Sequence, residues 1–207
     1  MKSLNTLFAA LLITSAGSAV AKSNVDLAVR GKITPSACEP SLPNGGNLDI
    51  GKISAKDLNV DTKTLLPTHV MQLTVTCDGS TLMALEAKDN REGSAFEDDA
   101  MLFGLGLINS SEKLGGMELR LVGPLLADGV DGRAIASRDG GLTWAAQHYF
   151  EVGNFVSVAT TAADTPTPVQ LLTADMNIQP IIAPTNGLTL TNEVEIDGSV
   201  TLTVKYL

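Results

Sequence analysis

Apolar and polar residues alternate along several stretches of this chain, which is the pattern of β-strands with one buried face. The first stretch runs from Val25 to Ile33, and a second lies in "MQLTVTC", residues 71–77, where Met71, Leu73, Val75 and Cys77 share one parity. A third lies in "GGMELRLV", residues 115–122. The longest is the C-terminal run, whose even positions are Val194, Ile196, Gly198, Val200, Leu202, Val204 and Tyr206. A strand of that kind needs both a core to cover and an edge to pair with.

Turn-forming residues separate these stretches, and no long helical pattern interrupts them. Turns are predicted at Pro43–Gly46, Asp78–Ser80, Asn109–Ser111, Asp128–Gly129 and Asp139–Gly141, and a loop at Ala162–Pro168. Short strands at this spacing are typical of an all-β sandwich rather than of alternating strands and helices.

The N-terminus reads as an export signal. A basic start at Lys2 precedes an apolar run that is too short to cross a bilayer and ends in Ala19-Val20-Ala21, a pattern that signal peptidase accepts. We therefore expect residues 1–21 to be a cleaved signal peptide and the protein to be exported to the periplasm.

Charge and cysteine content narrow the function classes. The chain has 14 Lys and Arg against 23 Asp and Glu, which argues against a nucleic-acid partner. Cys38 and Cys77 are its two cysteines, and in an oxidising compartment an even count predicts a disulfide. Closing a loop of this size stabilises a fold by roughly 4 kcal/mol in the chain-entropy model.

The stretch "SRDGGLTW", residues 137–144, resembles the Asp-box of sialidases and related β-propellers. A propeller needs several blades, and the motif occurs here once. We therefore expect a structural hairpin, built by Ser137, Asp139, Gly141, Thr143 and Trp144, with sugar stacking on Trp144 as the alternative. The sequence shows no catalytic triad, nucleophile elbow or phosphate loop, so we expect no enzyme activity, catalytic residue, metal or cofactor.

Several pieces in order resemble the subunits of chaperone–usher fimbriae. These are the signal peptide, "GKITPSAC" ending in Cys38, "MQLTVTC" ending in Cys77, and the closing alternating strand with penultimate Tyr206. The chain is more closely similar to an uncharacterised proteobacterial branch of pilin-like proteins. That similarity rests on "FGLGL" at 103–107, "DGGLTW" at 139–144 and "IDGSVTLTVKYL" at 196–207.

The resemblance implies an immunoglobulin-like, pilin-type β-sandwich that lacks one strand, so that an apolar groove stays open. It implies three segments: the signal peptide 1–21, an N-terminal extension 22–30 and a sandwich domain 31–207. The extension would act as a donor strand through Val25, Leu27 and Val29, docking on its own domain or on another copy.

The same resemblance implies partners and a location. A periplasmic chaperone would recognise the C-terminal strand through Val200, Leu202, Val204 and Tyr206, and an outer-membrane usher would pass the chain to other pilin subunits. The expected function is that of a structural or minor fimbrial subunit at the cell surface that contributes to adhesion, with a host or surface glycan as a further candidate partner. The alternative is a stand-alone exported carbohydrate-binding or adhesive β-sandwich module.

Overall fold

The computed structural model describes residues 27–28 and 37–207. The chain divides into two compact units, residues 1–33 and 34–207, and the strands described below belong to the second. The expected signal peptide, together with Val25 and Val29 of the expected donor strand, lies outside the described residues. Leu27 is described, and its side chain is 87% exposed.

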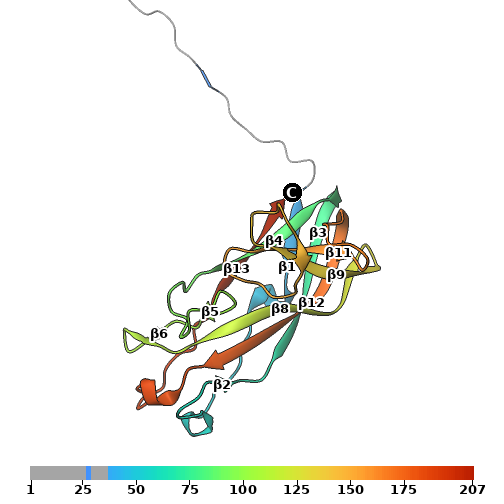
Figure 1. The fold of residues 1–207 in the computed structure, drawn as a ribbon. Helices are drawn as coiled ribbons and strands as arrows, with labels where there is room; N and C mark the ends of the chain where they lie inside the picture. Colours follow the sequence, from blue (N-terminus) through green and yellow to red (C-terminus); the bar gives the residue numbers. More distant parts are fainter. Residues whose placement is uncertain (1–26, 29–36) are drawn as a thin grey trace, which may run out of the picture. The chain divides into compact units, whose positions relative to one another are not determined.

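The described part of the chain is all-β, as predicted, with three short 3₁₀ turns and no α-helix (Figure 1). The turns are η1 (Pro43–Gly46), η2 (Ala55–Asp57) and η3 (Thr185–Gly187). The strands are β1 (Cys38–Ser41), β2 (Thr64–Leu65), β3 (His69–Thr81), β4 (Met83–Asp89), β5 (Phe103–Gly104), β6 (Leu107–Ile108), β7 (Glu112–Lys113), β8 (Gly115–Ala127), β9 (Val130–Ser137), β10 (Ala145–Ala146), β11 (Phe155–Thr160), β12 (Val169–Ile182) and β13 (Val200–Tyr206).

One antiparallel sheet forms most of the domain, in the order β1-β3-β12-β8-β9-β11-β4-β13. The sheet curls until its two end strands meet, where the Cys38 backbone N–H donates to the Tyr206 hydroxyl at 3.0 Å. β6 and β7 form a second, small sheet. The result is a nearly closed, sandwich-like fold around one main core.

The predicted alternation builds that core. In β3, Met71, Leu73, Val75 and Cys77 are all buried, and in β8 Leu119 and Leu121 face the same interior. Cys38 and Cys77 are directly opposite each other in the β1–β3 ladder and form the predicted disulfide. The predicted all-β fold class and the predicted Cys38–Cys77 disulfide are therefore confirmed.

Two element boundaries differ from the sequence prediction. The turn expected at Asp78–Ser80 is wrong, because β3 continues to Thr81 and the reversal comes at Leu82. Asp78 stays in the sheet since its backbone N–H donates to the Ala37 carbonyl, while its carboxylate accepts from the Ala37 N–H. At the other end, β13 begins only at Val200, because its partner β4 ends at Asp89 and offers no strand to the residues before it.

Candidate functional site

The candidate site is the seam between β1 and β13, the two ends of the sheet order. Among the described residues no ladder joins these strands, and a groove of about 690 Å³ lies between them. Leu42 flanks it on the β1 side and Leu202 on the β13 side, while Met71, Leu73 and Met176 form its floor. We call this space the seam groove. Its floor belongs to the main hydrophobic core.

A second cavity of about 650 Å³ extends the seam groove, sharing Leu48, Ile50 and Ile196 with it. Its two walls come from residues 48–58 and 190–197. The Lys52 ammonium contacts both Glu193 carboxylate oxygens at 3.1 Å and so links the walls through two exposed side chains. The two cavities adjoin at these shared residues, and both polar and apolar side chains line them.

The β13 side of the groove has an alternating edge. Val200, Leu202 and Val204 are half-buried against the main core, and Val194 and Ile196 pack on a second cluster that includes Leu105 and Ile182. The backbone edge of β13 that faces the groove has no ladder partner among the described strands. Such an edge is a template for an added strand. We refer to residues 192–199 as the groove wall.

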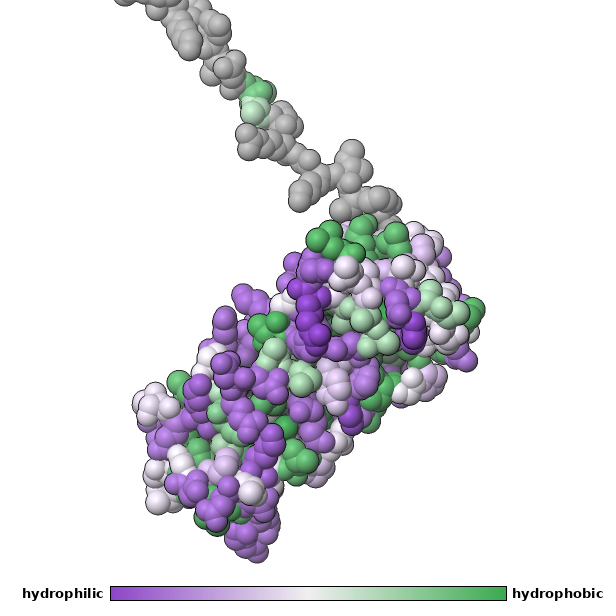
Figure 2. Space-filling view, in the orientation of Figure 1, coloured by the Kyte–Doolittle hydropathy of each residue, from purple (hydrophilic) through white to green (hydrophobic). Residues whose placement is uncertain are grey.

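Of the residues that the sequence predicted for chaperone recognition, three lie at or beside the groove and one does not. Val200 and Leu202 line the groove, and Val204 packs beside them on the same face. Tyr206 shares their parity, but its side chain is 43% exposed and its hydroxyl is engaged by Cys38. In Figure 2 apolar side chains gather at the end of the domain that carries the C-terminus, where Leu82 and Leu207 are also exposed.

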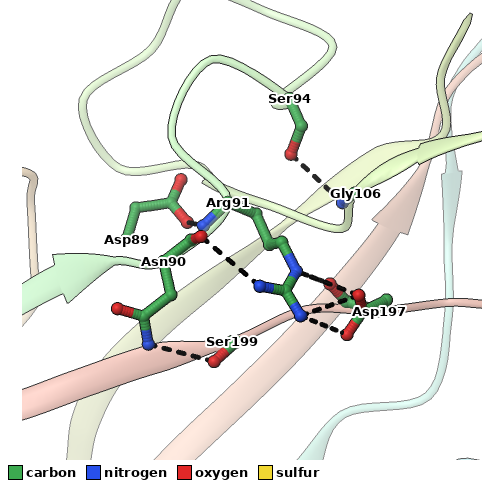
Figure 3. Close-up of polar contacts among 7 residues, drawn as sticks. All are labelled: Asp89, Asn90, Arg91, Ser94, Gly106, Asp197 and Ser199. Atoms are coloured by element: carbon green, nitrogen blue, oxygen red, sulfur yellow. Dashed lines mark hydrogen bonds and ion pairs between the residues drawn. The ribbon is translucent and has the colours of Figure 1, made fainter. Parts of the chain in front are cut away.

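A polar cluster holds the groove wall from behind (Figure 3). The Arg91 guanidinium, in the loop after β4, donates to both Asp197 carboxylate oxygens at 2.7 and 3.0 Å. The hydrogen bonds and charge of Asp197 raise the pKa of Arg91 above its usual range. Asn90 donates from its backbone to the Ser199 carbonyl at 2.9 Å and from its amide to the Ser199 hydroxyl at 3.0 Å. The wall is therefore fixed by side chains and single backbone contacts rather than by a ladder.

The hairpin of the Asp-box stretch is held by hydrogen bonds within itself. The Asp139 carboxylate accepts from the Ser137 hydroxyl at 2.7 Å, the Thr143 hydroxyl at 2.5 Å and the Thr143 backbone N–H at 2.9 Å. These donors, Ser137 first, hold the pKa of Asp139 well below its usual range. The Trp144 indole N–H donates to the Gly141 carbonyl at 3.0 Å, which fixes the ring within the hairpin.

A second carboxylate anchors the same hairpin to the domain. The Glu151 carboxylate, 8% exposed, receives two hydrogen bonds of 2.6 Å from Arg138 and one of 2.7 Å from Gln147. Arg138 is the main cause of a pKa of Glu151 below its usual range. Both carboxylates accept several hydrogen bonds, so Asp139 organises the hairpin and Glu151 attaches it to the domain.

Sequence reasoning missed the groove floor and the residues that hold the wall. Met71 was predicted to lie in a strand, but β12, which carries Met176, was not predicted. Nothing local in the sequence shows that a groove lies above these two residues. Arg91 and Asp197 are 106 positions apart, and neither lies in a recognisable motif. Only the strand order brings them together.

Comparison with known proteins agrees with one part of the closer resemblance, the uncharacterised proteobacterial family, and does not bear on pilins. A family model described as "Protein of unknown function (DUF1120)" matches residues 27–118. Protein GltF of Escherichia coli K12 is 27% identical, with 96% of this chain and 95% of that protein covered. The uncharacterized protein YhcF of the same organism is 24% identical, with 92% and 93% covered. These matches fit an uncharacterised proteobacterial family. Within the described residues, no helix has the length and apolarity needed to span a membrane.

Proposed function

We propose that this protein is a structural or minor subunit of a chaperone–usher type fimbria, and that its seam groove accepts an extended strand from a partner. The observation that carries the proposal is the missing ladder between β1 and β13 above an apolar floor. An added strand would pair its backbone with the free edges and place alternate side chains in the groove. The first partner would be a periplasmic chaperone and the next a neighbouring subunit, delivered through an outer-membrane usher after export.

The length of the chain's own N-terminal extension supports a neighbouring subunit as the final partner. Residues 22–30 match the stretch from Val194 to Leu202 in number, and nine residues in a strand reach about 30 Å. The apolar residues on one parity of this extension are Val25, Leu27 and Val29. A single strand is not stable in water, so these apolar side chains need a surface on which to dock.

Charge gives a smaller contribution to the same pairing. Glu193 and Asp197 of the groove wall are already paired with Lys52 and Arg91, which leaves Glu195 to meet Lys22, Arg30 or Lys32. The extension also carries the acidic Asp26. Opposite charges on neighbouring strands contribute roughly 0.2–1 kcal/mol per pair and disfavour wrong partners.

The test compares Leu27→Asp with Ala28→Asp in the full chain, expressed in the periplasm. Both variants add one negative charge, but the two residues lie on opposite parities of the extension. We expect wild type and Ala28→Asp to form multimers that resist mild denaturation. Leu27→Asp should lose them, because a charge placed in an apolar groove is costly.

Equal multimers in both variants would contradict the proposal. So would a wild-type monomer in which hydrogen exchange shows residues 25–29 protected on their own domain. The latter result would favour the stand-alone module.

A further inference from the structure

The groove wall has few attachments to the rest of the domain. Residues 193–199 belong to no strand, although they continue the alternation of β13. The described backbone contacts of the wall's C-terminal half are two: the Asp197 N–H donates to the Leu105 carbonyl at 3.1 Å, and the Ser199 carbonyl accepts from Asn90. A segment held this sparsely opens at a low free-energy cost unless side chains secure it.

Arg91 supplies the strongest of these side-chain attachments. Its Nε lies 3.0 Å from Asp197 Oδ2 and its Nη2 lies 2.7 Å from Oδ1, a two-point contact that fixes orientation as well as distance. The same Nε also lies 3.1 Å from the Asp197 carbonyl oxygen. One guanidinium thus holds both the side chain and the backbone of Asp197, which lines the second cavity beside the seam groove.

The position of Arg91 is itself fixed from the core. The Asp89 carboxylate, in a residue only 6% exposed, accepts from the Arg91 backbone N–H at 2.7 Å and from the Gly104 N–H at 2.8 Å. Ser94 accepts from the Gly106 N–H at 3.1 Å and ties the same loop to the link between β5 and β6, which carries Leu105 (Figure 3). A continuous set of contacts therefore runs from the end of β4 through Arg91 to the groove wall.

The groove wall also packs closely on Leu105, the residue between Gly104 and Gly106. A Cβ placed on Gly198 would lie 2.7 Å from the Leu105 Cδ2 and 3.2 Å from the Met117 Cε. A larger residue at position 198 would therefore require the end of the Leu105 side chain to move. Its placement is defined on one side by this packing and on the other by Arg91.

We propose that Arg91 is a positioning residue of the seam groove, holding the wall through Asp197 in the geometry that a partner strand pairs with. The inference rests on the proposed function for the identity of the ligand, a strand of the sequence of residues 22–30. When the wall is already ordered, the partner strand need not supply the free energy of ordering it, so binding is tighter. Without Arg91 the wall keeps its packing on Leu105 but loses its two-point tether.

The experiment compares Arg91→Ala and Arg91→Lys with Arg133→Ala in the full chain. Arg133 forms a closely matched ion pair with Asp164: side-chain exposures are 34% and 54% there, against 36% and 59% for Arg91 and Asp197. Arg133 lies on β9 and contacts the loop at Ala163, not the groove. Two quantities are measured: the hydrogen-exchange rates of amides 193–199, and the affinity for a labelled synthetic peptide of residues 22–30.

We expect Arg91→Ala to speed exchange across the wall and to weaken peptide binding by about fivefold, the scale of one part-exposed ion pair with its hydrogen bonds. Arg133→Ala should change neither, at a comparable loss of thermal stability. Arg91→Lys should show slower exchange and tighter peptide binding than Arg91→Ala, but should not reach the wild type. The lysine ammonium replaces the charge of Arg91 but not its two-point contact.

Unchanged exchange in Arg91→Ala would overturn the inference, and so would faster exchange with undiminished peptide binding. A wild-type chain that does not bind the peptide at all would overturn the proposed function and the ligand named here. In that case the exchange rates would still show whether Arg91 orders the wall.

Discussion

At the scale of single residues, the Cys38–Cys77 bond attaches the short strand β1 to the sheet. β1 has four residues and pairs only with β3, so the bond supplements a small ladder. Replacing either cysteine with serine should lower the free energy of unfolding by about 4 kcal/mol, because the sequence separation of 39 residues sets the loop entropy. Chemical denaturation of Cys38→Ser, Cys77→Ser and the double variant measures this loss. Cys77→Ser should lose somewhat more than Cys38→Ser, because its hydroxyl would be buried in the core. A Cys38→Ser variant as stable as the wild type would contradict this account.

Two glycines in long strands should respond differently to the same added methyl group. A Cβ on Gly115 of β8 would lie 2.1 Å from the Ile181 carbonyl oxygen, a backbone atom of the neighbouring strand β12 that cannot move without breaking the ladder. Gly79 of β3 has no atom within 4 Å of the corresponding position. We expect Gly115→Ala to lower the melting temperature strongly and Gly79→Ala to leave it nearly unchanged. Thermal unfolding of the two variants compares them directly.

At the scale of the element, the 137–144 hairpin should be a source of acid sensitivity. Its hydrogen bonds lower the pKa of Asp139 in the folded state, so they stabilise the ionised form. The contribution is complete above the pKa of an aspartate in the unfolded chain, about 3.9, and is lost as the pH falls below that value. Asp139→Asn should therefore flatten the fall in stability between about pH 4 and pH 2, while lowering stability at pH 7.

The matched control is Asp131→Asn, an exposed residue at the start of the same strand β9. Its acid unfolding profile should follow that of the wild type. If the two variants changed the profile equally, the hairpin network would not be the cause.

Individual strands also show where the alternation of apolar and polar residues is enough to predict an element. Alternation located β3, the middle of β8 and the C-terminal strand, because in each a core lies on one face and solvent on the other. It overestimated β13, since residues 193–199 alternate without having a strand to pair with. It placed a turn at Asp78–Ser80 from local composition, whereas tertiary hydrogen bonds to Ala37 keep that stretch in the sheet.

For the whole molecule, the sequence supported the all-β class and the disulfide but not the geometry of the candidate site. The half of the groove formed by Val200 and Leu202 was predictable from one strand. The other half was not, because it depends on the two ends of the sheet order facing each other. Contacts across that seam join residues as distant as Cys38 and Tyr206, which are 168 positions apart, and periodicity carries no information about such pairs.

The same separation bears on how quickly the domain folds. The strands on either side of the seam can approach only after the sheet between them has formed, and each such closure costs loop entropy before it gains contacts. Folds dominated by pairings of this kind fold slowly, on timescales of milliseconds to seconds or longer. During that interval β1 and β13 would expose free edges and an uncovered core, the features that lead folding chains to aggregate. An early binder of the seam would therefore act on the folding rate and yield of the domain as well as on its final state.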